Sequence, residues 1–216
     1  MILITSGAIV SSELQVELGK IPSAFVPLGN KPLYYYQVMQ LRKYFKNKDI
    51  IMSVPDSYRL RDTDIFQINK LDITLISVPS ELPLGHSVLY VINSIGRYDE
   101  SLSILHGDTY FDEFPVGEDL IALSNSEDDY AWEPEFNGSK KLGVWCGFFN
   151  FNDIKLFARS LTTARGHFVD AIRLYQSTIP LKLVYLDRWL DMGHVNTYYR
   201  SRCQHTTQRY FNGLTI

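Results

Sequence analysis

Two aspartates that follow apolar segments are the residues best suited to chemistry in this sequence. Asp108 comes shortly after the apolar run Leu102–Leu105, and Asp191 ends the tripeptide Trp189-Leu190-Asp191. Although they are 83 positions apart (191 − 108), a parallel sheet could bring both to the edge where such sheets bind ligands. Paired carboxylates there could hold Mg²⁺ and support phosphoryl or nucleotidyl transfer. The alternative is structural, with Asp108 in a turn and Asp191 capping the last helix.

Several small residues stand at places where a nucleotide could approach the backbone. Ser6 and Gly7 end the first apolar run, and Gly107 precedes Asp108. Glycine lacks a Cβ and therefore admits a base or a phosphate close to the chain. Pro83 and Gly85 form a turn that opens a helix, and a helix N-terminus favours anions. Each of these residues also fits an ordinary turn or helix cap, so the pattern alone leaves both interpretations open.

Composition and charge exclude several other kinds of protein. The 216 residues are 45% hydrophobic and carry a formal charge of −3, with a pI near 5.9, so no basic field attracts nucleic acid. No apolar run approaches the ~20 residues of a membrane span, and the start lacks the basic segment of a signal peptide. Cys146 and Cys203 match no disulfide framework or metal spacing, and the histidines have no zinc-site spacing. We expect a soluble, cytoplasmic protein, for which a homo-oligomer is compatible with the sequence.

The elements that would position these residues alternate between strands and helices. Such alternation predicts an α/β fold of three layers, with a mainly parallel, Rossmann-like mixed sheet between helices on both faces. A polar stretch, Asn125–Lys141, is expected to form a substrate-side loop or hairpin. The expected strands are 1–5, 49–54, 72–78, 102–105, 120–123, 144–151 and 181–186. The expected helices are 13–18, 33–45, 87–95, 153–160, 168–176 and 195–203.

Five segments, taken in order, resemble the sugar-phosphate nucleotidyltransferases. They are ILITSG, PSAFVPLGNKPLYYYQ from Pro22, ELPLGHS from Glu81, SILHGDTYFD from Ser103 together with the WCGFFNF strand from Trp145, and WLDMGH from Trp189 with Tyr198 beyond it. The resemblance covers nearly the whole chain and implies the fold shared by nucleotidyltransferases and GT-A glycosyltransferases. It also implies a nucleoside triphosphate and a phosphorylated small molecule as substrates, and Mg²⁺ as the cofactor.

Specific roles follow from the same resemblance, position by position. Asp108 and Asp191 match the metal-binding aspartates, and Ser6, Gly7, Pro83, Gly85 and Gly107 match nucleotide-binding positions. Gly147 lies where the sugar-phosphate site is expected, and Glu133 falls in the segment that corresponds to the family's Glu-Lys-Pro. Residues 1–205 would form the nucleotidyltransferase-like domain, and the tail 206–216 is a strand or the start of a further domain. The segment GHVNTYY from Gly193, followed by RYFN from Arg209, also resembles capsule-locus proteins in which a transferase-like domain precedes a kinase-like one.

The chain departs from the family pattern at three positively charged positions. The glycine-rich loop with its arginine is replaced by residues 7–11, the Pro-Lys pair by Pro22-Ser23, and the Glu-Lys-Pro lysine is missing around Glu133. A charge-assisted contact to phosphate is worth roughly 1.5–3 kcal/mol, so three losses should cripple catalysis unless another residue substitutes. Lys20, three residues before Ser23, is the best candidate.

Three functions are therefore compatible with the sequence. The first is a Mg²⁺-dependent nucleotidyltransferase that makes a nucleotide-activated precursor for surface polysaccharide and releases pyrophosphate. In it Asp108 and Asp191 hold the metal and Lys20 contacts phosphate. The second is a catalytically degenerate domain that binds a nucleotide or sugar nucleotide and has a regulatory or scaffold role. A glycosyltransferase is the third and less favoured, because Asp108-Thr109-Tyr110 lacks the second aspartate of an Asp-x-Asp motif.

Overall fold

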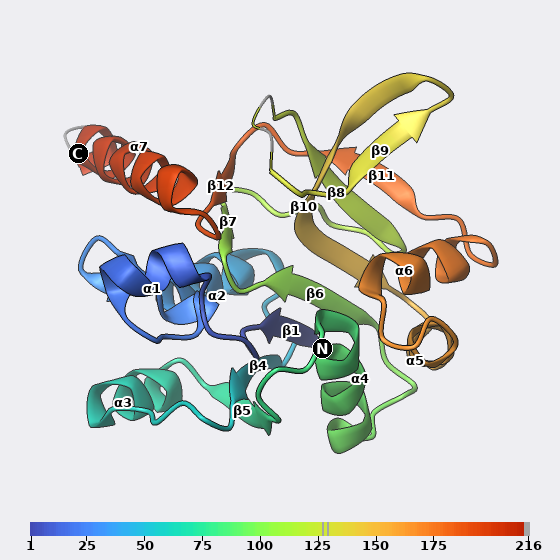
Figure 1. Ribbon diagram of the computed structural model, residues 1–216, viewed down its shortest axis with the longest axis horizontal. Helices are drawn as coiled ribbons and strands as arrows, with labels where there is room; N and C mark the ends of the chain where they lie inside the picture. The colour runs from blue at the N-terminus through green and yellow to red at the C-terminus, as the bar shows by residue number, and fades with distance from the viewer. Residues whose placement is uncertain (127, 129, 214–216) are drawn as a thin grey trace.

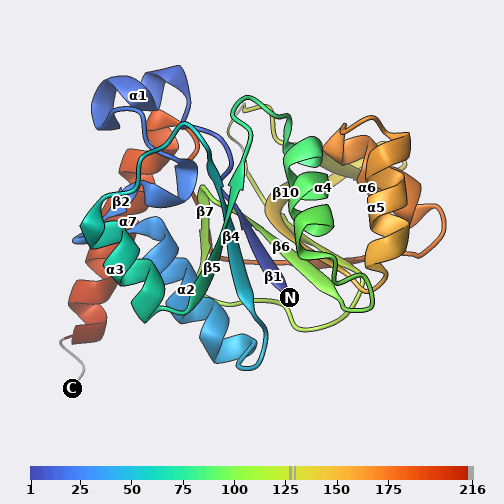
Figure 2. The ribbon, with the colours of Figure 1, turned by 90° about the horizontal axis from the view of Figure 1, so that it is seen from below.

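A mixed sheet between two layers of helices organises the chain in the computed structural model, which describes residues 1–126, 128 and 130–213. The strand order is β11-β8-β10-β6-β1-β4-β5, and β9 pairs with β10. Strand β10 runs antiparallel to β6 and β8, whereas the other pairs along that order are parallel. This mostly parallel α/β architecture confirms the expected fold class (Figures 1 and 2).

The bounds of the elements follow the apolar runs of the sequence closely. The strands are β1 Ile2–Thr5, β2 Pro27–Leu28, β3 Lys31–Pro32, β4 Ile50–Pro55, β5 Ile73–Val78, β6 Leu102–His106, β7 Thr109–Phe111, β8 Leu120–Ser124, β9 Pro134–Asn137, β10 Lys140–Phe151, β11 Lys182–Tyr185 and β12 Trp189–Asp191. The helices are α1 Ser12–Leu18, the 3₁₀ turn η1 Ser23–Phe25, α2 Leu33–Tyr44, α3 Asp62–Lys70, α4 Leu84–Ile95, α5 Ile154–Thr163, α6 Phe168–Gln176 and α7 Val195–Gly213.

Strand β1 shows how the two faces of the sheet are buried. Leu3 packs in the core under α4, α5 and α6, while its neighbours Ile2 and Ile4 pack in the core under α2 and α3. Successive side chains of a strand point to opposite faces, and a strand covered on both faces is apolar throughout. Figure 2 shows the sheet edge-on, with α4, α5 and α6 on one side and α1, α2, α3 and α7 on the other. The helices thus form the two outer layers that the alternation predicted.

A smaller core joins the first and last helices of the chain. Leu14 of α1, Leu28 of β2 and Tyr198 of α7 are all fully buried in it. The Tyr198 hydroxyl also donates a hydrogen bond to the backbone oxygen of Pro27, 2.9 Å away. This packing places the start of α7 beside the loop that follows β1. Two regions far apart in the sequence therefore form one side of the molecule (Figure 1).

Three helices differ from the sequence expectation. Helix α3 was not predicted, and helix α4 begins at Leu84 rather than at Ser87, with Pro83 as its N-cap. Proline suits a helix start because its missing N–H would have no intrahelical partner there. Helix α7, expected over 195–203, continues to Gly213 across the proposed boundary at 205/206. The strand option for the tail is therefore wrong for the residues up to Gly213, while a further domain stays a prediction.

Among the described residues, no helix has the length and apolar character that crossing a membrane requires.

Candidate functional site

A cavity of about 350 Å³ lies beyond the carboxyl ends of β1 and β6. These two strands are parallel neighbours, and Thr5 is in register with His106, so the loops that follow them meet. Residues 7–11 form one wall, and Gly107 and Asp108, in the turn between β6 and β7, form another. The start of α4 and Gly193-His194 complete the wall. The cavity therefore stands where an open parallel sheet binds ligands.

Asp108 and Asp191 both lie close to Gly193 in this region. The Met192 N–H donates a 2.8 Å hydrogen bond to the backbone oxygen of Asp108. A Cβ added to Gly193 would lie 2.8 Å from Asp108 Oδ2 and 3.5 Å from Asp191 Oδ1. The structure thus brings the two aspartates together, as the sequence suggested, but they do not both follow strands of the main sheet. Asp191 ends β12, which pairs antiparallel with β7 outside the main sheet.

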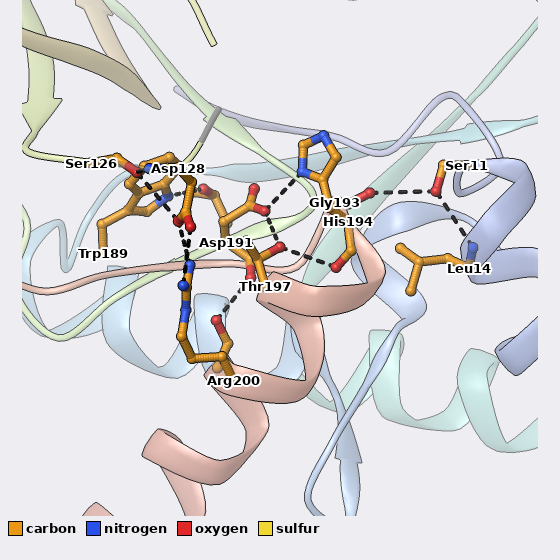
Figure 3. A network of polar contacts seen from close by, with 12 residues as sticks. Ser11, Leu14, Ser126, Asp128, Trp189, Asp191, Gly193, His194, Thr197 and Arg200 are labelled. Atoms are coloured by element: carbon orange, nitrogen blue, oxygen red, sulfur yellow. Dashed lines mark hydrogen bonds and ion pairs between the residues drawn. The ribbon is translucent and has the colours of Figure 1, made fainter. Parts of the chain in front are cut away.

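The surroundings of Asp191 fix its carboxylate. Its Oδ2 accepts a hydrogen bond from Thr197 Oγ1 and lies 3.1 Å from His194 Nδ1, while its backbone oxygen accepts from Ser201 Oγ (Figure 3). Asp191 therefore accepts hydrogen bonds from side chains in the first two turns of α7. It is not the N-cap of this helix, which begins at Val195. Burial, together with the nearby charge of Asp108, raises the pKa of Asp191. Two like charges so placed favour the arrival of a cation.

The donor set around Gly193 fits a hard divalent cation. Mg²⁺ prefers oxygen ligands and usually takes one or two carboxylates from the protein, with water and substrate phosphates completing its shell. Asp108 Oδ2 and Asp191 Oδ1 offer such oxygens toward one space. Within the described ranges, no group of three or more His, Cys, Asp or Glu side chains is placed to hold a metal. The site suits a metal that shares its shell with a phosphate and not one enclosed by protein.

Gln37 holds the turn that carries Asp108, a role that no pattern in the sequence indicates. Its side chain is fully buried on α2. Its Nε2 lies 2.6 Å from the backbone oxygen of Thr109, 3.0 Å from that of His106 and 3.3 Å from that of Gly107. Neighbouring Gln40 similarly donates to the backbone oxygen of Asp112. Helix α2 thus anchors the backbone on both sides of Asp108.

Gly7 and Gly107 stand in the cavity wall, and each is required there by close packing. A Cβ on Gly7 would lie 2.7 Å from Ser87 Oγ, and one on Gly107 would lie 2.5 Å from Ser23 Oγ. Distances below 3.0 Å are too short for a side chain without a shift of the neighbours. Ser23 also lines the cavity. The glycines therefore let three segments converge at the site.

The other predicted nucleotide-binding residues lie behind the wall. Ser6 donates its N–H to Ser53 Oγ and accepts a hydrogen bond from the Ala24 N–H, both at 3.0 Å. Pro83 caps α4, and a Cβ on Gly85 would lie 2.3 Å from the backbone oxygen of Gly166. None of the three is among the residues that line the cavity. They support the wall, whereas Leu82, Leu84 and Ser87 supply its surface.

Positive charge is missing from the described wall of the cavity, which contains neither lysine nor arginine. Lys20 is exposed and is not part of that wall. His106 is in the wall, but burial lowers the pKa of its imidazole, which favours the neutral form. Hydrogen-bond donors remain, because the backbone N–H groups of Gly7, Ala8 and Ile9 donate to no other group of the described chain. The first turn of α4 borders the cavity as well.

A second cavity, of about 320 Å³, lies next to the first. Glu133 is in its wall, and Gly147 lies behind that wall. This cavity shares Leu84 and His106 with the first. Gly147 has a φ of +87° at an irregularity of β10 and lies against His106, whose Cβ would be 3.0 Å from an added Cβ. His106 therefore stands between the two cavities, with Gly147 backing its ring.

The segment after β8 packs over the start of α7. Tyr130 stacks on His194, with ring centroids 3.9 Å apart. Asp128 forms an ion pair of 2.5 Å with Arg200 of α7 (Figure 3). The two contacts place this segment beside Asp191, at the border of both cavities. The sequence indicated a loop or hairpin at 125–141, and β9 with β10 confirms a hairpin in its second half.

Comparison with known proteins agrees with the fold. No family model and no curated protein sequence matches the chain. Solved structures do match, among them a nucleoside-diphosphate-sugar pyrophosphorylase from Vibrio cholerae, with 15% identity, a TM-score of 0.67, and coverage of 94% of this chain and 100% of the other. A proposed glucose-1-phosphate thymidylyltransferase from Bacillus anthracis, solved with sucrose, has 15% identity, a TM-score of 0.72 and 94% coverage of both chains.

A third similar structure is the inositol-1-phosphate CTP transferase from T. maritima, at 14% identity and a TM-score of 0.66, covering 94% of this chain and 95% of the other. Likeness at these identities establishes the fold that these three nucleotidyltransferases share with this chain. The site of this chain therefore consists of two neighbouring aspartates at the ends of strands of a nucleotidyltransferase-like fold.

Proposed function

We propose that this protein is a nucleotidyltransferase that joins a nucleoside triphosphate to a phosphorylated small molecule and releases pyrophosphate. One observation carries the proposal, namely that carboxylate oxygens of Asp108, which lines the cavity beyond β1 and β6, and of Asp191, which is buried next to that wall, both lie within 3.5 Å of one point over Gly193. Of the three sequence hypotheses, this one uses both aspartates. A role in surface polysaccharide synthesis, with substrates activated in the cytoplasm, is the finer part of the proposal and comes from the sequence resemblance.

The reaction needs two anions to be held in line. A phosphate oxygen of the acceptor attacks the α-phosphorus of the triphosphate, forming a new P–O bond. The bond from the α-phosphorus to the bridging oxygen of the β-phosphate breaks, and its electron pair leaves with pyrophosphate. With a dianionic phosphate monoester no proton has to move. Positioning and charge neutralisation then supply most of the catalysis.

The residues of this chain would divide that work. The free N–H groups of residues 7–9 and the start of α4 would bind the triphosphate, since such N–H groups favour anions. Asp108 and Asp191 would hold Mg²⁺, which when bound neutralises charge that develops on the phosphates. Gln37 keeps the Asp108 turn in place. Lys20 as a phosphate contact stays a prediction, which requires the exposed side chain to reach the cavity.

Pyrophosphate release tests the proposal directly. The purified protein is incubated with Mg²⁺, each of ATP, CTP, GTP and UTP, and a panel of phosphate monoesters that includes hexose 1-phosphates and aminoalkyl phosphates. Pyrophosphate formation that requires both substrates and disappears with EDTA supports the proposal. No pyrophosphate with any pair, from a protein that binds a triphosphate, contradicts it.

The second candidate, a degenerate nucleotide-binding domain, is favoured by the absence of lysine and arginine from the described cavity wall. Calorimetry with the four triphosphates, with and without Mg²⁺, separates the two candidates. Tight binding without turnover identifies a binding domain, whereas turnover identifies the transferase.

A further inference from the structure

Four aromatic rings, those of Trp132, Trp145, Phe149 and Phe168, line the second cavity. Trp145 and Phe149 of β10 and Phe168 of α6 are buried, and Trp132 is half-buried. Trp132 packs edge-on against Trp189 with ring centroids 4.6 Å apart, which fixes its place at the cavity edge. Aromatic faces carry negative electrostatic potential and attract cations.

Negative charge adds to these rings. The carboxylates of Glu133 and Asp170 are in the wall, and no lysine or arginine is present in its described part. Asp170 is exposed and forms no ion pair with the described chain. A dianionic ligand that filled this cavity alone would meet two carboxylates and no lysine or arginine; the other ionisable side chains of its described wall are His106 and His167.

The wall already accommodates one cation from the protein itself. The guanidinium of Arg173 lies behind the cavity, 4.7 Å from the centre of the Trp145 ring. It also pairs with Glu133 at 3.4 Å and with Glu135 at 2.9 Å. One guanidinium thus serves two carboxylates, so this cluster keeps an excess negative charge even after the pairing.

His106 connects the aromatic cavity with the Asp108 cavity. It lines both, and its ring packs near Phe149 and Phe168, with centroids 5.5 and 5.8 Å away. Its buried Nε2 has no hydrogen-bond partner in the described chain. An unsatisfied buried polar atom is costly, and a ligand that spans the two cavities would pass the side chain that carries it.

We propose that the phosphorylated acceptor carries its own positive charge, as an ammonium or trimethylammonium group held a few atoms from the phosphate. This inference rests on the proposed function and names its substrate class. The cationic group occupies the cavity of Trp132 and Asp170, and the phosphate lies beyond His106, toward Asp108. An acceptor of this kind brings the counter-charge that both walls lack. A neutral sugar could stack on the same rings but leaves Asp170 without a cationic partner, whereas Glu133 already shares Arg173 with Glu135.

A binding experiment separates charge from shape. Phosphocholine is titrated into the full chain by calorimetry alongside 3,3-dimethylbutyl phosphate, which has nearly the same shape without the positive charge, and glucose 1-phosphate. The titrations are made with Mg²⁺, alone and with α,β-methylene analogues of the four triphosphates. We expect phosphocholine to bind about tenfold more tightly than the other two, as a desolvated cation–aromatic contact allows.

Two variants place the effect in the aromatic cavity. Trp132→Leu and Asp170→Asn should each weaken phosphocholine binding by about fivefold or more and change binding of 3,3-dimethylbutyl phosphate by less than about twofold. Asp62→Asn is the matched control for Asp170→Asn, because Asp62 is also an exposed aspartate in the first turn of a helix. It should leave binding unchanged. Melting temperatures report whether each variant is folded.

The outcomes for the acceptor and for the reaction are distinct. Equal binding of phosphocholine and its neutral analogue, preference for glucose 1-phosphate, or no phosphocholine binding under any condition overturns the cationic acceptor. Turnover of glucose 1-phosphate in preference to phosphocholine also overturns it, while the nucleotidyltransferase proposal stands. Selective phosphocholine binding without pyrophosphate release from any triphosphate supports the cationic ligand and contradicts the transferase.

Discussion

The carboxylates of Asp108 and Asp191, 83 positions apart in the chain, border one space over Gly193, which would hold a Cβ 2.8 Å from Asp108 Oδ2 and 3.5 Å from Asp191 Oδ1. The turn after β6 provides one carboxylate and the ribbon strand β12 provides the other. The proximity of two like charges raises the free energy of the protein until a cation binds. The proposed activity depends on this relationship more than on any other.

Asp108→Asn should abolish Mg²⁺-dependent pyrophosphate release and remove the thermal shift that Mg²⁺ produces. Without Mg²⁺ the variant should be at least as stable as the parent chain, because the substitution removes the carboxylate that raises the pKa of Asp191. Differential scanning fluorimetry over a Mg²⁺ titration measures both effects. Asp187→Asn, at an exposed aspartate away from Gly193, serves as the control. Full turnover by Asp108→Asn would exclude the metal assignment.

Gly193→Ala should preserve the fold and reduce kcat by roughly 100-fold, a loss that misplacement by about 1 Å can cause. The new methyl group would occupy the space between the two carboxylates. Circular dichroism and a melting curve verify the fold, and pyrophosphate release measures the rate. Unchanged kcat would mean that the space over Gly193 is not where the reaction occurs.

Gln37→Met should lower the free energy of unfolding by about 1–3 kcal/mol, because buried carbonyl groups lose their donor. The substitution keeps the length of the side chain but not its N–H groups. Urea denaturation measures stability, and a fall in kcat greater than the rise in KM would show that Gln37 positions the Asp108 turn. Gln204→Met on the exposed part of α7 is the control. An unaffected kcat would limit Gln37 to a role in stability.

Lys20→Ala distinguishes a phosphate ligand from a distant surface charge. A direct phosphate contact is worth roughly 1.5–3 kcal/mol, so its loss would lower kcat/KM by more than about tenfold. From its exposed position outside the cavity wall, we expect less than about a threefold decrease, which should vanish in high salt because exposed charges are screened. A larger decrease that persists in salt would restore Lys20 as a phosphate ligand.

Asp128→Asn should destabilise the protein by less than about 1 kcal/mol at pH 7, the usual range for an exposed ion pair. The Arg200 guanidinium lowers the pKa of Asp128 below its ordinary value of 3.8. A lowered pKa in the folded state contributes stability above the ordinary pKa and loses that contribution as the pH falls. The difference between parent and variant should therefore disappear between about pH 4 and pH 2. Urea denaturation at several pH values measures it, and a constant difference would contradict the ion pair.

Much of the fold could be predicted because apolar runs and turn residues are local signals. Strands β4, β6 and β8 lie within one residue of the expected bounds at each end. Helix α3 was missed because its nine residues carry only a short apolar stripe around Ile68. The end of α7 was missed although neither glycine nor proline interrupts the chain between Val195 and Gly213.

The candidate site was predictable where its residues follow apolar runs of the sequence. Asp108, Asp191 and Gly107 were found in this way, the family resemblance assigned their roles, and these roles stay predictions. Gln37 was missed because a buried glutamine leaves no mark in the sequence that distinguishes it from an exposed one. The importance of His106 depends on contacts with Phe149 and Phe168, which come from segments far along the chain. Proximity in sequence suggested Lys20, but it could not show which way the chain turns between α1 and η1.

The hold of Gln37 on the Asp108 turn has an evolutionary consequence. Gln37 grips backbone oxygens on both sides of Asp108, and every amino acid supplies a backbone oxygen. Side chains around the cavity can therefore be exchanged over generations without moving the aspartate. A lineage can therefore lose the lysines and arginines that suit one ligand and adapt to another ligand. Its fold and the position of the aspartate persist even when sequence comparison no longer detects the relationship.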